Sequence, residues 1–446
     1  MNIILLSGGS GTRLWPLSNE VRSKQFLRIF RNEDGGRESM VQRVYRMIRK
    51  NHPAVGITIA TSEKQTEAIR AQLGGNVSVS IEPCRRNTFP AIALACAYLH
   101  DKLGVSEEEF TVVCPIDCLV EESFFQAFGR LEERALESGE NLVLMGMKPT
   151  CPSEKYGYIL PRMDGESASV EAFSEKPCKE KAEALIKRGA LWNGGVFAFR
   201  LGYVLDRAKE LLGTASYESL FDQYASLPKI SFDYAVSEHE EKLGVVRYDG
   251  LWEDIGTWDT LTAAMSEQTL GDVVSDRCSN VYAINELGIP LVTYAVSDVV
   301  VAASPDGILV SGLSESAGIK SCVEGLGKRP MCEEKEWGHY TVLDYSTSAD
   351  GTGSLTKQIV IASGRHISYH THTNRSEHWT VTAGQGRIII EGVANAVRPG
   401  DSYSVKPGVK HAIYAETELR LIEVQLGEDL SEDDINRLDW DWSTYG

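Results

Sequence analysis

The first 150 residues of this sequence alternate between short apolar runs and segments with helical spacing. The apolar runs cover residues 3–6, 55–61, 77–81, 110–116 and 142–147, and each predicts a buried strand. Residues 39–50 have apolar side chains at helical spacing behind Ser39, a candidate N-cap. Residues 90–103 predict a helix with Pro90 in its first turn. Strand–helix alternation predicts an α/β fold with a mostly parallel, doubly wound sheet, whose ligands bind at the carboxyl ends of the strands.

The rest of the chain has a different pattern. A length of 446 residues predicts two or three domains, of which residues 1–267 are the first. Between 268 and 330, short β-branched runs separated by Gly, Pro, Asp and Ser predict a small all-β connector. From 331 to 446, alternating strands with glycine turns predict a compact β-barrel or jelly roll. We find no long internal repeat and no low-complexity segment.

Composition excludes several classes of protein. The net charge of -18 argues against a nucleic-acid-binding surface. No run of about 18 apolar residues predicts a membrane span, and the N-terminus lacks the pattern of a signal peptide. Nine scattered cysteines without a C-x-x-C pair fit reduced thiols in a cytosol. We therefore expect a cytoplasmic protein with no nucleic-acid or membrane partner, in which an anionic substrate needs a local cationic pocket.

A glycine loop behind the first strand is the first candidate site. Gly8, Gly9 and Gly11 can let backbone N–H groups approach a phosphate closely. The loop matches neither the Walker pattern nor the dinucleotide pattern, and a purely structural turn is an equally good interpretation of the glycines alone. The cations that follow favour phosphate binding. Arg13 can donate two parallel hydrogen bonds to phosphate oxygens, and Lys24 offers a point charge.

Further segments follow in an order that is typical of one family. They are LSGGSGTRLWPLS and KQFL in the opening stretch, EPCRRNTFPAI at 82–92, KYGYI at 155–159, FSEKP at 173–177, LWNGGVFAF at 191–199, SFDYAVSE at 231–238 and WEDIGTWD at 252–259. Over residues 1–262 the chain resembles the nucleoside-diphosphate-sugar pyrophosphorylases, specifically the mannose-1-phosphate guanylyltransferases. This resemblance implies a Rossmann-like nucleotidyltransferase domain that transfers GMP from GTP to mannose 1-phosphate, giving GDP-mannose and pyrophosphate.

The resemblance also implies roles for individual residues. Arg13 and Lys24 would neutralise charge on the triphosphate and the leaving pyrophosphate, and Asp117 and Asp254 would hold Mg²⁺ with the phosphates. The implied nucleotide-binding residues are Leu6, Ser7, Gly8, Gly9, Gly11, Thr12, Arg13, Arg86, Asn87 and Thr88. The implied sugar-phosphate-binding residues are Gly157, Glu175, Lys176, Asn193 and Asp254.

Structural and functional alternatives stay open. The structural ones are helix capping for Asp117, a turn for Asp254, a solvated ion pair for Glu175 and Lys176, and core packing for Trp192, Trp252 and Trp258. Phe89 is bulkier than the alanine usual in the family. Cys118 follows the metal aspartate without the usual nearby histidine, and a redox role for Cys114 and Cys118 is a further alternative. The chain could also be a guanylyltransferase for another manno-configured sugar 1-phosphate such as a heptose, or an inactive GDP-sugar-binding regulatory protein.

A second candidate site lies in the C-terminal part, where histidines cluster. His370 and His372 stand two residues apart on a predicted strand and so face the same side. Glu377 follows after a turn, and His411 comes later in the chain. This spacing is typical of cupin metal motifs, whose fold is a jelly roll. It implies a ligand set of these four residues for Zn, Mn, Fe or Ni, with a chance cluster on a polar face as the alternative.

The segment NRSEHW at 374–379 and the tail from residue 422 resemble the isomerase half of bifunctional phosphomannose isomerase/guanylyltransferases. Arg375 matches an arginine of that motif, whereas His370 stands where the family usually has glutamine. Mannose-6-phosphate isomerase activity is one interpretation, and a metal-bound but inactive, structural or oligomerising cupin is the other. We expect GTP and mannose 1-phosphate as substrates and a homo-oligomer, a dimer, as the assembly.

Overall fold

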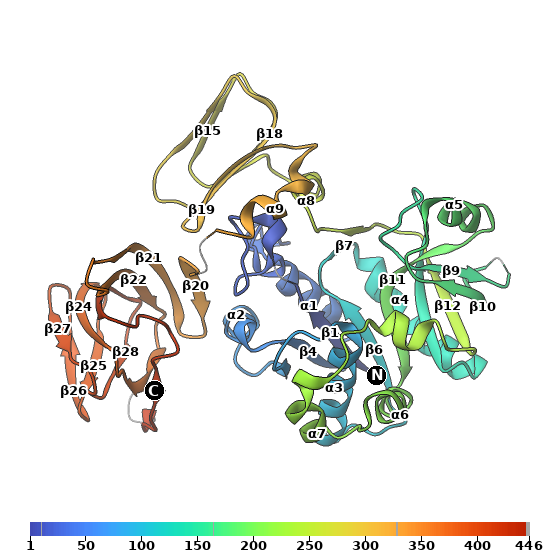
Figure 1. The fold of residues 1–446 in the computed structure, drawn as a ribbon, viewed down its shortest axis with the longest axis horizontal. Coiled ribbons are helices and arrows are strands. Elements are labelled where there is room, and N and C mark those ends of the chain that lie inside the picture. The colour runs from blue at the N-terminus through green and yellow to red at the C-terminus, as the bar shows by residue number, and fades with distance from the viewer. Residues whose placement is uncertain (10, 164, 327–328, 443–446) are drawn as a thin grey trace. The chain divides into compact units, whose positions relative to one another are not determined.

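The structure, a computed structural model, describes residues 1–9, 11–163, 165–326 and 329–442 (Figure 1). Contacts between residues divide the chain into two compact units, and each is described by itself. The first unit holds Met1–Ser10, Ser23–Thr66 and Asn76–Ser266, and the second holds Gly11–Arg22, Glu67–Gly75 and Glu267–Gly446. The short segment Gly11–Arg22 follows the glycine loop along the chain but packs with residues of the C-terminal half.

A nine-stranded sheet runs through the described part of the first unit, in the order β5-β4-β1-β6-β11-β8-β12-β10-β9. Its strands are β1 (Asn2–Ser7), β4 (Gly56–Ser62), β5 (Ser78–Glu82), β6 (Phe110–Pro115), β8 (Leu142–Met147), β9 (Tyr158–Pro161), β10 (Ser167–Ser174), β11 (Leu191–Arg200) and β12 (Leu243–Tyr248). The five strands predicted from apolar runs are confirmed within one residue as β1, β4, β5, β6 and β8. The helices are α1 (Met40–Asn51), α3 (Thr88–Asp101), α4 (Glu122–Ser138), α5 (Lys179–Lys187), α6 (Leu201–Leu212), α7 (Tyr217–Asp222) and α8 (Trp258–Ala264). Helix α2 (Glu63–Leu73) begins in this unit, and its residues from Glu67 onward belong to the second.

The sheet is parallel on one side and mixed on the other. β5, β4, β1 and β6 pair in parallel, as the strand–helix alternation predicts. β11 runs antiparallel to both β6 and β8, and β10 runs antiparallel to both β12 and β9. The prediction of a mostly parallel sheet therefore describes one half only. The chain enters β11 at the carboxyl edge of the sheet, because Asn193 near its start pairs with Gly146 near the end of β8.

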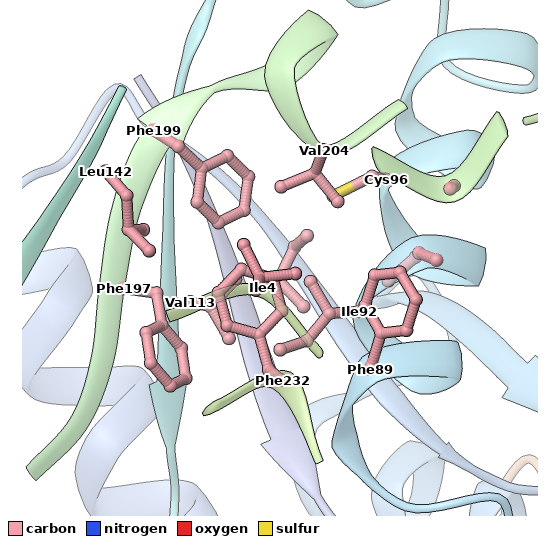
Figure 2. Packing of buried hydrophobic residues seen from close by; sticks show 14 of the residues in the cluster. Ile4, Phe89, Ile92, Cys96, Val113, Leu142, Phe197, Phe199, Val204 and Phe232 are labelled. Carbon is pink, nitrogen blue, oxygen red and sulfur yellow. The ribbon is translucent and has the colours of Figure 1, made fainter. Parts of the chain in front are cut away.

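The core of the first unit lies between the sheet and helices α3 and α6 (Figure 2). Ile4 of β1, Val113 of β6 and Phe199 of β11 pack with Ile92 of α3 and Val204 of α6, and all five are fully buried. Full burial of such a side chain stabilises a fold by about 1.5–3 kcal/mol. The packed sheet therefore fixes the strand ends from which the loops at its carboxyl edge begin.

Both predicted helices are present, and side chains cap their N-termini. Ser39 forms a capping box with Gln42 before α1, with the Ser39 hydroxyl accepting from the Gln42 N–H at 3.3 Å. α3 begins at Thr88, two residues before the predicted segment, and Pro90 lies in its first turn. The Asn87 side chain caps it by accepting from the Thr88 N–H at 2.9 Å.

Two short strands bring distant parts of the first unit together at the carboxyl edge. They are β7 (Cys118–Val120) and β13 (Trp252–Asp254), which pair antiparallel so that Asp254 lies opposite Cys118. The Ile255 N–H also donates to the Asp117 carbonyl at 3.2 Å. Another short pair, β2 (Phe30–Arg31) with β3 (Arg37–Glu38), lies nearer the N-terminus of the chain.

The predicted all-β connector, residues 268–330, is β up to Gly312, where its strands stack as successive coils, but it ends in helical turns that the prediction missed. The strands are β14 (Thr269–Leu270), β15 (Val273–Asp276), β16 (Ser279–Asn285), β17 (Leu291–Tyr294), β18 (Ser297–Ser304) and β19 (Gly307–Gly312), followed by the short helix α9 (Lys320–Val323). β15 pairs in parallel with β17, and β16 pairs in parallel with β18. Both pairings join residues 18 positions apart, as in Val273 with Leu291 and Val281 with Val299.

The C-terminal part is a sandwich of two antiparallel sheets, which matches the predicted jelly roll. Its strands are β20 (Cys332–Lys335), β21 (Gly338–Thr347), β22 (Gly353–Ile361), β23 (His366–Thr371), β24 (Arg375–Ala383), β25 (Gly386–Ile390), β26 (Val393–Val397), β27 (Ser402–Val405), β28 (His411–Ala415), β29 (Leu419–Gly427) and β30 (Asn436–Arg437). The sheet orders are β20-β21-β22-β29-β24-β27 and β26-β25-β28-β23-β30. Leu355 and Leu421 of one sheet pack with Ile388 and Ile413 of the other. Among the described residues, no helix has the length and apolar character that a membrane crossing requires.

Candidate active site and metal centre

A cavity of about 310 Å³ opens at the carboxyl ends of β1, β4 and β6 in the first unit. Of the expected nucleotide-binding and metal-binding residues, it is lined by Leu6, Ser7, Gly8, Gly9, Asn87, Thr88 and Asp117. A Cβ added at Gly8 or Gly9 would meet no protein atom within 4 Å, so these glycines leave space for a ligand. Gly9 also has a φ of 138°, a backbone conformation that side chains disfavour.

The arginines at 85 and 86 have different roles in this region. Arg85 lines the cavity, and its guanidinium donates to the Gly9 carbonyl at 3.0 Å. Arg86, which the family resemblance places near the nucleotide, donates instead to the Tyr224 carbonyl at 3.2 Å. The structure therefore brings Arg85, which the sequence analysis did not select, to the glycine loop.

Lys24, Asp117 and Asp254 meet in one cluster beside this cavity. The Lys24 ammonium lies 3.0 Å from Asp117 Oδ2 and 3.4 Å from Asp254 Oδ1, and it donates to the Ile255 carbonyl at 2.7 Å. The side chains of Lys24, Asp117 and Asp254 are 15%, 34% and 40% exposed, so a solvent-borne ligand can reach the carboxylates. Burial disfavours the charged lysine, but the two carboxylates outweigh it and raise the pKa of Lys24.

The donor set at this cluster fits Mg²⁺. Asp117 and Asp254 come from separate strand ends, and the β7–β13 pairing holds them on either side of one cation. Mg²⁺ prefers one or two carboxylates together with water and phosphate oxygens. The neighbouring thiols of Cys114 and Cys118 are buried, which raises the pKa of each well above its usual value. Protonated, enclosed thiols are poor nucleophiles, so the geometry gives no support to a redox pair.

A second cluster joins Gly157, Glu175, Lys176 and Asn193. A Cβ at Gly157 would lie 2.6 Å from Glu175 Oε2 and 3.3 Å from the Asn193 Cβ, so only glycine fits there. The Asn193 N–H donates to the Gly157 carbonyl at 2.8 Å. Lys176 Nζ lies 2.6 Å from Glu175 Oε1, and the Glu175 side chain is only 4% exposed. The Lys176 side chain is 49% exposed, so only the carboxylate of this pair is buried.

Asp233 completes this cluster and was not selected from the sequence. Its Oδ1 accepts a hydrogen bond from Asn193 Nδ2 at 2.6 Å. The preceding residue, Phe232, is fully buried with its ring centroid 4.6 Å from that of Phe197, which anchors Asp233 to the core. Burial, followed by the negative charge of Glu175, raises the pKa of Asp233 to about 7. The only sequence signal was its place in the segment SFDYAVSE.

Aromatic side chains connect the two clusters of the first unit. Tyr156 packs on Trp192 and Trp252 with ring centroids 4.9 Å and 5.3 Å apart. Trp192 directly precedes Asn193, and Trp252 lies on the same strand as Asp254. Trp192 is buried as well, and Trp258 is fully buried in the core.

Gly11, Thr12 and Arg13 belong to the second unit and are described with it. Thr12 and Arg13 lie in the 3₁₀ turn Thr12–Leu14, and Gly11 precedes it with a φ of 65°. A Cβ at Gly11 would lie 2.6 Å from the Asn19 carbonyl oxygen, so the turn requires glycine here. The Arg13 side chain is exposed.

The predicted cupin ligands His370, His372, Glu377 and His411 converge at the mouth of the C-terminal sandwich. All four are at most 4% exposed. The ligating atoms of the three histidines lie within 4.8 Å of one another. Glu377 Oε1 lies 3.0 Å from His372 Nε2, and Glu377 Oε2 lies 3.6 Å from His411 Nε2.

The protonation pattern of the three imidazoles fits a metal ion. Each histidine places Nδ1 against a backbone carbonyl: His370 at 2.6 Å from Ser368, His372 at 2.6 Å from Asp434 and His411 at 2.9 Å from Val409. When Nδ1 carries the proton, Nε2 is a lone pair, and the Nε2 atoms of His370 and His372 then face each other at 3.0 Å. The His411 Nε2 is buried without a hydrogen-bond partner among the described residues. A bound cation would relieve the repulsion between the two facing Nε2 lone pairs and would give the His411 Nε2 a partner.

A cavity of about 340 Å³ adjoins the histidines within the second unit. Cationic side chains on its wall include Lys335, Lys357, Arg365 and Arg375. Arg375 is buried and donates from Nε to Glu377 Oε1 at 3.0 Å, so it also orients that carboxylate. The wall also carries carboxylates, and Lys357 and Arg365 pair with two of them, Glu432 and Glu336. The lining beside the histidines is therefore of mixed charge.

Comparison with known proteins identifies the family. A model described as Nucleotidyl transferase matches residues 2–270, and one described as Mannose-6-phosphate isomerase C-terminal matches residues 331–440. The chain is 32% identical over 479 residues to xanthan biosynthesis protein XanB of Xanthomonas campestris pv. campestris (strain B100), covering 99% of this chain and 98% of the relative. It is 29% identical to the mannose-1-phosphate guanylyltransferase of Escherichia coli (strain K12), covering 97% of each.

A solved structure agrees with these matches. The crystal structure of mannose-1-phosphate geranyltransferase from Thermus thermophilus superposes with a TM-score of 0.60 at 29% identity, covering 72% of this chain and 98% of that one. The chain therefore belongs to the nucleotidyl transferase family, among the mannose-1-phosphate guanylyltransferases, and carries a C-terminal domain of the mannose-6-phosphate isomerase type.

Proposed function

We propose that this chain transfers GMP from GTP to mannose 1-phosphate, forming GDP-mannose and pyrophosphate. The observation that carries this proposal is the position of Lys24. Its ammonium lies between Asp117 and Asp254, and Asp117 also lines the cavity of the glycine loop. A cation and two carboxylates beside a glycine loop are what a triphosphate with Mg²⁺ requires.

The reaction needs no covalent enzyme intermediate. An oxygen of the sugar 1-phosphate bonds to the α-phosphorus of GTP as the bond from that phosphorus to pyrophosphate breaks. Catalysis then depends on positioning and on neutralising negative charge. Lys24 supplies positive charge to the phosphates, and the N–H groups of the loop at Gly8 and Gly9 donate to phosphate oxygens. Asp117 and Asp254 would hold Mg²⁺, which supplies further charge neutralisation when bound.

The second cluster supports binding of the sugar phosphate. Glu175 can accept hydrogen bonds from sugar hydroxyls, and Lys176 can pair with the phosphate. Gly157 lets the Glu175 carboxylate keep its place, because a Cβ there would lie 2.6 Å from Glu175 Oε2. Asn87 and Thr88 lie on the cavity wall and are proposed to contact the nucleoside, together with Arg85. That the base is guanine and the sugar is mannose is proposed from the family to which the chain belongs.

We propose metal-dependent interconversion of mannose 6-phosphate and fructose 6-phosphate as a second activity, in the C-terminal domain. The observation in its favour is the cavity beside the cluster of His370, His372 and His411, whose wall carries lysine and arginine side chains among its carboxylates. These histidines and Glu377 would hold a divalent transition metal, which would polarise the oxygens of an open-chain sugar. Lys357 and Arg365 would supply positive charge for the sugar phosphate. A metal-bound structural cupin is the competing proposal.

Activity assays on the purified full chain test both proposals. Pyrophosphate release with GTP and mannose 1-phosphate would support the proposed guanylyl transfer. Release with GTP and a heptose 1-phosphate instead would keep the reaction but identify the heptose phosphate as the substrate. Absence of release with every pair would favour a GDP-sugar-binding protein. Interconversion of the two hexose 6-phosphates, abolished by His411→Ala, would support the isomerase. Light scattering of the same sample tests the predicted dimer.

A further inference from the structure

A π-helical turn, Asp233–Ser237, adjoins the second cluster of the first unit. The turn is closed by the Glu238 N–H, which donates to the Asp233 carbonyl at 2.9 Å. An i→i+5 hydrogen bond of this kind makes the turn wider than an α-helical one, so Glu238 follows Asp233 after one turn. Two carboxylates can therefore reach neighbouring parts of the same cluster, and turns of this kind are frequent at functional sites.

The Asp233 carboxylate fixes the side chain of Asn193. Asp233 Oδ1 accepts from Asn193 Nδ2 at 2.6 Å, and Asn193 Oδ1 accepts from the Gly195 N–H at 3.1 Å. Asn193 is also buried. Both ends of the amide have a partner, which determines its orientation and leaves one N–H hydrogen and one oxygen lone pair for a ligand.

Glu238 holds the backbone that follows β10. Its Oε1 accepts from the Glu175 N–H at 3.0 Å. The next residue, Lys176, has a φ of 42°, in the left-handed region that residues other than glycine disfavour. The hydrogen bond to the preceding N–H helps to hold this strained turn. It thereby also holds the Lys176 ammonium, which lies 2.6 Å from Glu175 Oε1.

The segment that leads into the π turn is attached to the nucleotide cavity. The Phe232 N–H donates to Thr88 Oγ1 at 2.8 Å, and the Phe89 N–H donates to the Ile230 carbonyl at 3.2 Å. Thr88 lines the cavity of the glycine loop. Phe232 is fully buried in the core (Figure 2). Residues 230–238 therefore contact both the nucleotide cavity and the second cluster within one unit.

We propose that Asp233 and Glu238 are positioning residues for guanylyl transfer, which set the orientation of the sugar phosphate relative to the nucleotide. They act by holding Asn193 and the turn at Glu175 and Lys176 in place, and neither needs to touch the substrate. This inference rests on the proposed function. The attacking oxygen must approach the α-phosphorus roughly opposite the leaving pyrophosphate, so a displaced sugar phosphate reacts more slowly.

A set of variants at Asp233 tests the first contact. Asp233→Ala removes the acceptor for the Asn193 amide, whereas Asp233→Asn keeps an oxygen that can accept the same hydrogen bond. Asn193→Ala supplies a background without that amide. Asp101→Ala is the matched control, since Asp101 Oδ2 accepts from the Tyr217 N–H at 2.7 Å outside the cluster.

We expect Asp233→Ala to raise the KM for mannose 1-phosphate about tenfold and to lower kcat, with the KM for GTP within about twofold of the unaltered chain. Asp233→Asn should recover the KM for mannose 1-phosphate to within about threefold, and Asp101→Ala should stay within about twofold. In the Asn193→Ala background, Asp233→Ala should add less than about twofold. An unchanged KM for the sugar phosphate in Asp233→Ala, an equal rise in the KM for GTP, or an undiminished effect in the Asn193→Ala background would overturn the inference.

Glu238→Ala tests the second contact through an exposed side chain, which the fold does not need for its core. It should raise the KM for mannose 1-phosphate about threefold or more, and Glu238→Gln should reverse the rise because it keeps an acceptor oxygen. Glu240→Ala is the control, since Glu240 Oε2 accepts from the Tyr203 hydroxyl at 2.6 Å. Equal KM values in Glu238→Ala and Glu240→Ala would overturn the role of Glu238. Absence of pyrophosphate release by the unaltered chain would overturn the proposed function itself, and the inference with it.

Discussion

The Lys24 ammonium and the Asp117 carboxylate lie 3.0 Å apart at the carboxyl edge of the sheet. Lys24 begins a 3₁₀ turn in which Gln25 and Phe26 are buried. Gln25 Nε2 donates to the Ser7 hydroxyl at 3.0 Å, so the turn is attached directly to the end of β1. The cation is therefore held relative to both the glycine loop and the carboxylates of Asp117 and Asp254, and such preorganisation would lower the cost of organising the transition state.

Lys24→Gln should lower kcat by about 100-fold or more, because it removes one preorganised charge from the reacting phosphates. Steady-state pyrophosphate release measures this effect. Lys50→Gln is the control, since Lys50 forms an exposed ion pair with Glu122 at 2.9 Å outside the site. Turnover of Lys24→Gln equal to that of Lys50→Gln would remove Lys24 from the mechanism.

Gly157→Ala should raise the KM for the sugar phosphate about tenfold or more and leave the KM for GTP nearly unchanged. The reason is steric, because the new Cβ would lie 2.6 Å from Glu175 Oε2 and 3.0 Å from the Phe173 ring. Gly129→Ala, in helix α4, is the control, since a Cβ there meets no atom within 4 Å. An unchanged KM for the sugar would show that this cluster does not contact it.

Asp233 should make the stability of the chain depend on pH. Its pKa rises from an ordinary 3.8 to about 7 on folding, because burial and the charge of Glu175 disfavour the carboxylate. The folded state therefore binds the proton more tightly than the unfolded state. This contribution to stability is present in full below about pH 4 and is lost as the pH rises through about 7.

Asp233→Asn cannot ionise and should remove this dependence. Denaturant unfolding at several pH values between 4 and 8 measures the difference between the variant and the unaltered chain. We expect the free energy of unfolding of Asp233→Asn, relative to the unaltered chain, to increase steadily over that range. Two parallel curves would mean that Asp233 ionises alike in the folded and unfolded states.

Metal removal should destabilise the C-terminal domain. A chelator should lower the melting temperature of its transition by about 5 °C or more, and an added divalent transition metal should restore it. His411→Ala should bind no transition metal by elemental analysis and should not respond to chelator. His378→Ala is the control, because His378 is exposed although it neighbours Glu377. An identical response of both variants would exclude the histidine cluster as the metal site.

Local patterns were enough to predict much of this molecule. The strand at residues 110–116 and the helix behind Ser39 follow from periodicity and capping, which are properties of neighbouring residues. The convergence of His370 and His411 was expected from the cupin motif and is present as a contact, whereas the ion pair of Lys24 with Asp117 was not predicted. These predictions rest on periodicity, on helix capping and on sequence motifs.

The features that were missed depend on contacts between distant residues. β11 runs antiparallel to β8 because the chain enters it at the carboxyl edge of the sheet. No pattern among neighbouring residues predicts that entry point. Whether Arg85 or Arg86 faces the glycine loop depends on Tyr224, far along the chain. The two coils of the connector share left-handed residues at equivalent places, Arg277 with Ala295 and Asn280 with Asp298, although their side chains differ. The backbone therefore repeats every 18 residues in these two coils, but the residues at equivalent positions differ, so the repeat was not found in the sequence.

Pyrophosphate release by the full chain tests guanylyl transfer most directly. GTP, ATP, UTP and CTP would each be combined with mannose 1-phosphate, glucose 1-phosphate and a heptose 1-phosphate in the presence of Mg²⁺. We predict rapid release with GTP and mannose 1-phosphate, and a loss of about 100-fold or more on Lys24→Gln with that pair. Absence of release with every pair, in protein that is folded and binds its metals, would contradict guanylyl transfer.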